Sequence, residues 1–226
     1  MITIENVSKN FTLHNQNSVV IPVMANADLT VRPGECVGLT GESGAGKSTL
    51  MRMVYGNYLT QAGRIMVGDL DIVTAAPREI LALRRETLGY VSQFLRVVPR
   101  VATLDVVSEP MLAVGATQES AHIRAAELLT KLRIPQHLWS LSPLTFSGGE
   151  QQRVNIARGF AHQYPAMLLD EPTASLDAAN RETVLSLIEA AKAGGAAIIG
   201  IFHDENARAR VCDREVDVSV FTPKAA

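Results

Sequence analysis

The sequence predicts an α/β protein with a mostly parallel sheet core, an N-terminal antiparallel β layer and an inserted helical segment. Three observations carry this prediction. Short apolar segments alternate with segments of helical spacing, which is typical of a parallel sheet covered on both faces. A glycine-rich loop at residues 41–48 joins an apolar segment to a helical one. Residues 94–146 have a different, mainly helical character.

Length and composition favour one globular domain. The chain has 226 residues, of which 47% are hydrophobic and 19% charged, values that fit a domain with an inserted subdomain. The net charge of -2 offers no basic excess for nucleic acid. We expect one domain over residues 1–226, in which 1–93 and 147–226 form the core with its antiparallel layer and 94–146 form a helical subdomain.

The lack of a recognisable secretion signal and the cysteine usage indicate a cytoplasmic protein. The first ten residues lack the charged start and apolar run of a secretion signal. The longest strongly apolar stretch, residues 196–202, falls far short of a membrane-spanning helix. Cys36 and Cys212 form no disulfide framework, and we interpret both as small buried apolar side chains. We therefore expect no direct membrane insertion.

The N-terminal layer is predicted from alternation and turn residues. Residues 2–7 alternate apolar and polar side chains, as a half-buried strand does. Residues 19–23 and 27–31 indicate further strands, and Arg-Pro-Gly at 32–34 indicates a turn.

Helical spacing is clearest at residues 118–132, where five apolar residues fall on one face: Ala121, Ala125, Leu128, Leu129 and Leu132. The remaining predicted elements are apolar strands at 36–39, 167–169 and 196–202, and helices at 48–55, 148–162 and 181–193.

Residues 41–48, Gly-Glu-Ser-Gly-Ala-Gly-Lys-Ser, fit the phosphate-loop pattern G-x-x-x-x-G-K-[ST] in full. The glycines let the backbone wrap so that N–H groups face phosphate oxygens, and the following helix adds its positive end. Lys47 can reach the β- and γ-phosphates, and Ser48 can ligate Mg²⁺. The sequence therefore predicts a site for ATP and Mg²⁺. Its expected contacts are Gly41, Ser43, Gly44, Ala45, Gly46, Lys47, Ser48 and Thr49.

Two carboxylates follow the apolar strand predicted at 167–169. Asp170 can hold Mg²⁺, and Glu171 can orient or deprotonate the attacking water. Two acids after a strand can also simply begin a loop, but the phosphate loop upstream favours the catalytic interpretation.

Residues 147–153, Ser-Gly-Gly-Glu-Gln-Gln-Arg, open a predicted helix. Ser147 can cap it, while Gly148 and Gly149 allow a phosphate to approach its positive end. The segment resembles the signature motif of ATP-binding cassette (ABC) proteins, usually written LSGGQ, although Phe146 and Glu150 depart from it. In that family the motif contacts the γ-phosphate held by the opposite subunit. The resemblance thus implies a head-to-tail dimer, with itself or with a related ABC subunit, in which residues 147–150 contact nucleotide.

Four further positions resemble ABC motifs in the expected order and imply a RecA-like core. Gln93 resembles the glutamine that senses Mg²⁺ and couples to partners, which implies metal and catalytic roles. Ser175-Leu176-Asp177 resembles the loop that crosses the dimer interface, and implies that Asp177 lies near nucleotide. His203 resembles the histidine near the γ-phosphate. Phe11 stands where the family places an aromatic ring against adenine.

Three classes of ABC protein differ in how they use the energy of ATP hydrolysis. DNA-repair and chromosome ATPases carry long coiled-coil insertions with sustained heptads, and no such run is present here. ATPases of lipoprotein-release or exporter type look similar at residues 7–9 and 103–112, which leaves a membrane transporter as the alternative.

The third class is a subunit of a soluble enzyme complex, and it is favoured by a closer resemblance. Residues 48–59, 92–101, 145–160 and 198–205 resemble the PhnL family of ABC-type proteins, part of the bacterial carbon–phosphorus lyase system for phosphonate breakdown. The resemblance implies an accessory ATPase grouped with the α-D-ribose 1-methylphosphonate 5-triphosphate synthase machinery. Its implied partner is the soluble carbon–phosphorus lyase core complex, which it would bind or remodel.

Overall fold

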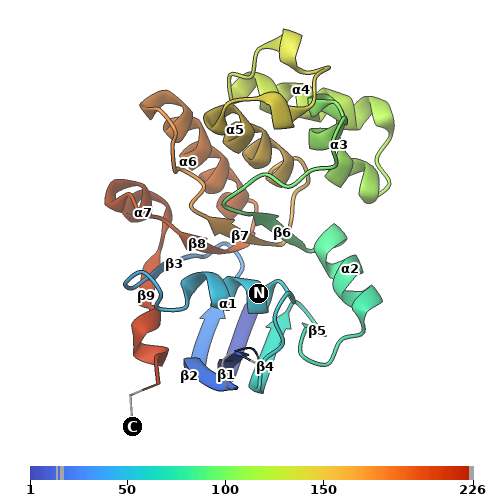
Figure 1. Cartoon of the computed structure of the whole chain (residues 1–226). Coiled ribbons are helices and arrows are strands. Elements are labelled where there is room, and N and C mark those ends of the chain that lie inside the picture. Colours follow the sequence, from blue (N-terminus) through green and yellow to red (C-terminus); the bar gives the residue numbers. More distant parts are fainter. Residues whose placement is uncertain (14, 16–17, 224–226) are drawn as a thin grey trace.

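The structure, a computed structural model, describes residues 1–13, 15 and 18–223. It contains two sheets in separate layers, with helix α1 (Lys47–Val54) between them and most other helices on the far side of the larger sheet (Figure 1). One sheet is parallel and the other antiparallel. The predicted fold class is confirmed.

The antiparallel sheet has the order β2-β1-β4-β5, formed by β2 (Val19–Val31), β1 (Ile2–Leu13), β4 (Ala62–Val67) and β5 (Leu70–Asp71). The two strands predicted at 19–23 and 27–31 are one continuous strand, so that prediction was wrong. Pairing between β1 and β2 shifts register at three places, and Asn26 has a φ of 50°. Such irregularities let a strand continue past a local kink.

The parallel sheet has the order β6-β7-β8-β3-β9, formed by β6 (Leu88–Val91), β7 (Ala166–Asp170), β8 (Ala197–Ile201), β3 (Cys36–Thr40) and β9 (Arg214–Asp217). Because its strands run in the same direction, their carboxyl ends share one edge. That edge carries the phosphate loop after β3, Asp170 and Glu171 at the end of β7, and His203 after β8. Ligands of open parallel sheets bind at such an edge.

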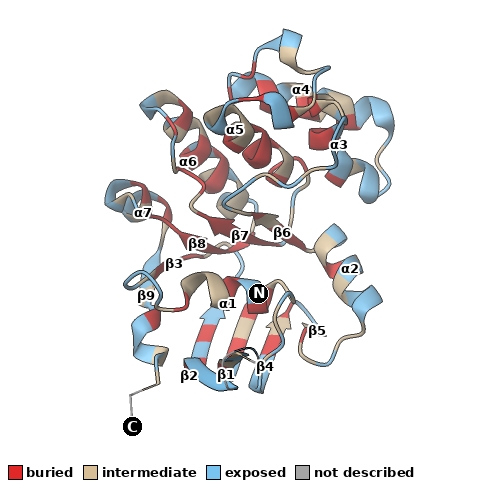
Figure 2. Ribbon diagram, viewed as in Figure 1, coloured by how far each residue is buried: buried red, intermediate tan, exposed pale blue. Residues whose placement is uncertain are grey.

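Successive side chains of β7 point to opposite faces of the sheet and so belong to two different hydrophobic clusters. Met167 and Leu169 pack in one cluster with helices α5 (Gly148–Gly159) and α6 (Ala178–Ala193). Leu168 faces the opposite cluster, which joins α1 to the antiparallel sheet. Figure 2 shows the central strands β3, β7 and β8 buried between these layers, whereas the edge strand β9 is mostly exposed. Burial on both faces explains why these three central strands are continuous apolar runs in the sequence.

Residues 94–146 contain α3 (Thr103–Ala113), α4 (Gln118–Lys131) and two 3₁₀ turns, η1 (Gln136–Leu138) and η2 (Pro143–Thr145). The apolar face predicted for 118–132 is buried: Ala121, Ala125, Leu128, Leu129 and Leu132 are all inaccessible to solvent. Helix α4 contacts α3 and α5. We keep the division of the chain at residues 94–146 as a proposal.

Outside residues 94–146, two α-helices had not been predicted, α2 (Pro77–Glu86) and α7 (Glu205–Val211). Pro77 occupies the first turn of α2, and Glu79 Oε2 accepts a 2.7 Å hydrogen bond from the Ala76 amide, so its start is well capped. Over the residues described, no helix combines the length and apolarity needed to cross a membrane.

Candidate active site

The phosphate loop connects β3 to α1. Gly46 precedes α1 with a φ of 99°, a left-handed conformation that favours glycine. A Cβ there would also lie 3.1 Å from Val23 Cγ1, whereas one on Gly44 would meet no atom within 4 Å. The loop is therefore tightly wrapped against β2 and open on the Gly44 side, as a phosphate cradle requires.

Backbone carbonyl groups of the phosphate loop hold the Lys47 side chain in place. Its Nζ donates to the carbonyl oxygens of Gly41 at 2.6 Å and Glu42 at 2.8 Å. The ammonium charge consequently lies where a polyphosphate bound by the loop would need it. The hydroxyl-bearing Ser48 and Thr49 follow in the first turn of α1.

Asp170 ends β7 and is almost buried, with 5% of its surface exposed. Tyr90 Oη donates to its Oδ2 at 3.2 Å. Burial raises the pKa of Asp170, while the hydrogen bond from Tyr90 opposes that rise. Burial and the adjacent Asp170 raise the pKa of Tyr90, which keeps its hydroxyl protonated as a donor. Tyr90 was missed from the sequence, where its only signal is a polar-tipped ring three residues before Gln93.

Glu171 brings the three predicted catalytic side chains together. His203 Nε2 lies 2.7 Å from Glu171 Oε1, and Gln93 Nε2 makes a long contact of 3.5 Å with Oε2. The Glu171 backbone has a φ of 54°, and its amide donates to Ile201 O at 3.0 Å. A non-glycine residue in this left-handed region is uncommon and marks a constrained position. The cluster draws on the ends of β6, β7 and β8.

The segment that resembles the ABC signature forms a complete capping box at the start of α5. Glu150 Oε2 accepts from the Ser147 amide at 2.9 Å and from Ser147 Oγ at 2.6 Å, and the Glu150 amide donates back to Ser147 Oγ at 3.4 Å. These bonds from Ser147 lower the pKa of Glu150. A Cβ on Gly148 would meet no atom within 4 Å, so this helix end is open to an approaching group.

Asp177 caps another helix. Its Oδ1 accepts from the Asn180 amide at 2.7 Å and its Oδ2 from Asn180 Nδ2 at 2.8 Å, at the start of α6. The Asn180 bonds lower the pKa of Asp177. Two residues earlier, Ser175 has a φ of 60°. The predicted role of Asp177 near nucleotide stays a prediction.

Phe11 lies on β1 and packs edge-on against Tyr58, with ring centroids 5.3 Å apart. Lys9 Nζ lies 4.8 Å from the Phe11 centroid and donates to Leu59 O at 2.7 Å. Sequence reasoning did not find Tyr58 as a neighbour of Phe11, because no local pattern joins β1 to the residues after α1. Stacking of Phe11 on adenine stays a prediction.

The predicted metal ligands fit Mg²⁺ by their chemistry. Ser48 offers a hydroxyl, Gln93 an amide oxygen and Asp170 a carboxylate, which are the hard oxygen donors that Mg²⁺ prefers. Asp170 is nearly buried and Tyr90 bonds only one of its oxygens, so the other oxygen is available to a cation.

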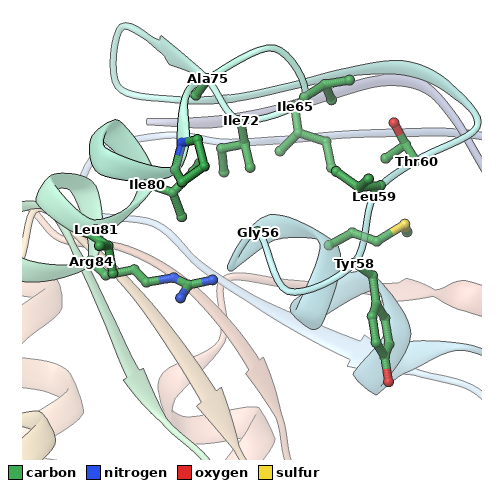
Figure 3. Close-up of a pocket in the computed structure, with 13 residues that line it drawn as sticks. Gly56, Tyr58, Leu59, Thr60, Ile65, Ile72, Ala75, Ile80, Leu81 and Arg84 are labelled. Atoms are coloured by element: carbon green, nitrogen blue, oxygen red, sulfur yellow. The ribbon is translucent and has the colours of Figure 1, made fainter.

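A separate apolar cavity of about 350 Å³ lies near the far end of α1 (Figure 3). Its walls include Met53, Ile65, Ile72, Ile80 and Arg84. None of the predicted site residues is among its lining residues, so we assign it no part in the chemistry.

The family is shown by comparison with known proteins. The ABC transporter family model matches residues 24–174, which contain the phosphate loop, the signature segment, Asp170 and Glu171. The uncharacterized ABC transporter ATP-binding protein YvrO of Bacillus subtilis is 33% identical over 216 residues, covering 96% of this chain and 92% of YvrO. The lipoprotein-releasing system ATP-binding protein LolD of Granulibacter bethesdensis is 36% identical over 218 residues, covering 96% and 93%.

A solved structure agrees. The ATP-binding cassette MJ0796, solved as a dimer in a post-hydrolysis state bound to ADP and Pi, matches with a TM-score of 0.87 and 26% identity. The match covers 97% of this chain and 95% of that one. The chain is therefore an ABC-type ATP-binding protein and belongs to the ABC transporter family.

Proposed function

We propose that the chain is a Mg²⁺-dependent ATPase that works as an ATP-driven dimer. The observation that carries this proposal is the cluster of Glu171, His203 and Gln93, which the ends of three neighbouring strands hold together. The phosphate loop lies at the same edge of the sheet, so a γ-phosphate bound there would meet this cluster.

Glu171 is the group that accepts the proton of the attacking water. His203 occupies its Oε1 at 2.7 Å, whereas Oε2 has only the long Gln93 contact of 3.5 Å. Oε2 is thus the oxygen that can orient the water and take its proton. Lys47 exchanges its loop carbonyl partners for phosphate oxygens when the nucleotide binds. Ser48, Gln93 and Asp170 would hold Mg²⁺, which would neutralise phosphate charge when bound.

A dimer is expected because, among the described residues, no hydrogen bond joins residues 147–150 of one chain to the phosphate loop of that same chain. In a head-to-tail pair, the open end of α5 would face the nucleotide of the other subunit. MJ0796, solved as a dimer bound to ADP and Pi, supports the expectation of a dimer. The second subunit is either another copy or a related ABC protein.

We propose further that the ATPase serves the phosphonate carbon–phosphorus lyase system, as an accessory subunit of the ribose 1-methylphosphonate 5-triphosphate synthase machinery in the cytoplasm. The support is the sequence resemblance at residues 92–101 and 145–160. The first of these segments also carries two exposed apolar side chains, Phe94 and Val98, each 70% accessible, which suit a contact with a partner protein.

The second candidate is the ATP-binding subunit of a membrane transporter of lipoprotein-release or exporter type. It is favoured by relatives such as LolD and the macrolide export ATP-binding/permease protein MacB of Marinobacter nauticus. MacB is 32% identical over 219 residues, which cover 97% of this chain and 33% of MacB.

A pull-down separates the two candidates. Tagged Glu171→Gln protein is expressed in its own host under phosphate starvation, purified with ATP and Mg²⁺, and its partners are identified by mass spectrometry. The Lys47→Ala/Glu171→Gln double variant is the control, because it should not form the ATP-bound state. Carbon–phosphorus lyase subunits bound only by the single variant would support the first candidate. A multi-span permease would establish the second.

A further inference from the structure

The two cysteines of the chain are neighbours in the fold although 176 residues separate them. Cys36 begins β3 and Cys212 follows α7, and their Sγ atoms lie 3.8 Å apart. Cys36 is buried and Cys212 is partly exposed. The chain contains no other cysteine. Interpreting each as an isolated apolar side chain therefore misses a dithiol.

The backbone around this dithiol is held in place on both sides. The Cys36 amide donates to Asp213 Oδ2 at 2.8 Å, and the Asp213 amide donates to Cys36 O at 2.8 Å. Lys192 Nζ fixes the same carboxylate through Oδ1 at 2.6 Å. Parallel pairing of β3 with β9 then starts at Val37 and Arg214. These contacts keep residues 36 and 212 adjacent in the folded chain.

The two sulfurs already lie close to bonding distance. A disulfide has an S–S length of about 2.05 Å, so from 3.8 Å the thiols must approach by roughly 2 Å. The missing side chain of Gly38 leaves space for the Cys212 sulfur beside β3, because a Cβ there would lie 3.0 Å from Cys212 Sγ.

The two thiols have unequal chemical roles. The hydrogen bond with Cys36 lowers the pKa of Cys212, and Arg208 and Lys192 act in the same direction, against burial and Glu215. The same contact, together with burial, raises the pKa of Cys36. The thiolate is the reactive form of cysteine, so the partly exposed Cys212 attacks first and the buried Cys36 reacts second.

We propose that Cys36 and Cys212 form a redox-sensitive dithiol that closes into an intramolecular disulfide on meeting a small-molecule disulfide such as oxidised glutathione. The Cys212 thiolate attacks one glutathione sulfur, forms a mixed disulfide and releases one glutathione thiolate. Cys36 then attacks Cys212 Sγ and releases the second. The protein thiols lose two electrons, glutathione disulfide gains them, and the two thiol protons pass to the released glutathione.

The closed bond would connect two parts of the molecule that flank the candidate active site. Strand β3 leads into the phosphate loop, and α7 begins two residues after His203. Oxidation would thus link β3, which precedes the phosphate loop, covalently to the residue that follows α7. Because the crosslink closes a long stretch of chain, the oxidised protein should also unfold at a higher temperature than the reduced one.

The test uses the full chain. Reduced, folded protein is incubated with oxidised glutathione, quenched in acid, unfolded and alkylated with N-ethylmaleimide for intact-mass analysis. We expect a monomer lighter by two hydrogen atoms, without alkylation, and one tryptic species that joins the peptides of Cys36 and Cys212. Cys36→Ser should stop at one glutathione on Cys212, and Cys212→Ser should leave Cys36 free to be alkylated after unfolding.

Three outcomes would overturn the proposal: two alkylated cysteines in the treated wild type, a lasting glutathione adduct on Cys212, or a disulfide-linked dimer. Formation of the bond only after urea unfolding would also contradict it. Thermal melting of both serine variants, with and without glutathione, verifies that they fold. The melting temperatures of the two serine variants should not rise on oxidation, whereas that of the wild type should rise by several degrees.

Discussion

His203 Nε2 lies 2.7 Å from Glu171 Oε1, so the side chain after β8 fixes the carboxylate at the end of β7. The contact is strongly asymmetric in exposure, since 72% of the His203 side chain and 21% of the Glu171 side chain are accessible. Glu171 is also constrained by its left-handed backbone and by the bond from its amide to Ile201. The carboxylate is therefore preset, whereas the imidazole still presents a surface that nucleotide can cover.

Glu171→Gln should abolish turnover without loss of ATP binding. The amide keeps the size of the carboxylate and can still accept from His203, but it cannot take a proton. We expect the ATPase rate to fall by at least about 100-fold, the usual scale of general-base catalysis. ATP affinity by calorimetry should be unchanged, and size-exclusion chromatography should reveal a dimer that depends on ATP.

Glu5→Gln is the matched control, since Glu5 is an exposed carboxylate on β1. It should leave turnover and oligomeric state as in the wild type. If Glu171→Gln retains hydrolysis, Glu171 is not the base.

Lys47→Ala should weaken ATP binding itself. A hydrogen bond to a charged group contributes about 1.5–3 kcal/mol, which corresponds to a dissociation constant raised roughly 10- to 100-fold. Calorimetric titration with ATP and Mg²⁺ measures it. Lys131→Ala removes an exposed lysine from the last turn of α4 and should leave affinity unaltered. Equal affinity in the wild type and Lys47→Ala would refute the phosphate-loop assignment.

Sequence patterns located the centre of the parallel sheet better than its edges. Strands β3, β7 and β8 lie within one residue of the predicted 36–39, 167–169 and 196–202, because burial on both faces makes them continuous apolar runs. Edge strand β9 was not predicted. Its sequence Arg-Glu-Val-Asp has no apolar pattern, and it is held by pairing with β3 and by the ion pair between Arg214 and Glu35.

The candidate site shows a similar division. Motif spacing was enough to name Lys47 and Glu171, because each role needs that residue type at the end of a strand or in a loop, whereas His203 was named only by resemblance to ABC proteins. The supporting contacts of Tyr90 with Asp170, and of Cys36 with Cys212, join residues 80 and 176 positions apart. Such contacts depend on strand order, which local periodicity does not carry.

Variants in the capping box at the start of α5 distinguish an effect on stability from an effect on ATP hydrolysis. Ser147→Ala removes the side chain that accepts from the Glu150 amide, and should lower the free energy of unfolding by about 1 kcal/mol in urea titrations. If Ser147 also contacts the nucleotide of the other subunit, the ATPase rate of Ser147→Ala should fall much further than this small destabilisation explains.

Glu150→Gln is the companion variant. Glutamine can also close a capping box, so stability at neutral pH should change little. A loss of stability as large as that of Ser147→Ala would mean that the negative charge, rather than the hydrogen bonds, supports the start of α5.

The two ends of α5 can be tested with the same substitution. A Cβ on Gly159 would lie 2.4 Å from Val91 Cγ2, so Gly159→Ala should push α5 away from β6 and lower the free energy of unfolding by about 1–3 kcal/mol. Gly148→Ala meets no atom within 4 Å and should leave stability unchanged or slightly raised, because alanine favours helix. Its ATPase rate should nevertheless fall, if a phosphate must approach the bare backbone there. A fully active Gly148→Ala would argue that the open end of α5 does not contact nucleotide, while a stable Gly159→Ala would contradict the close packing of α5 on β6.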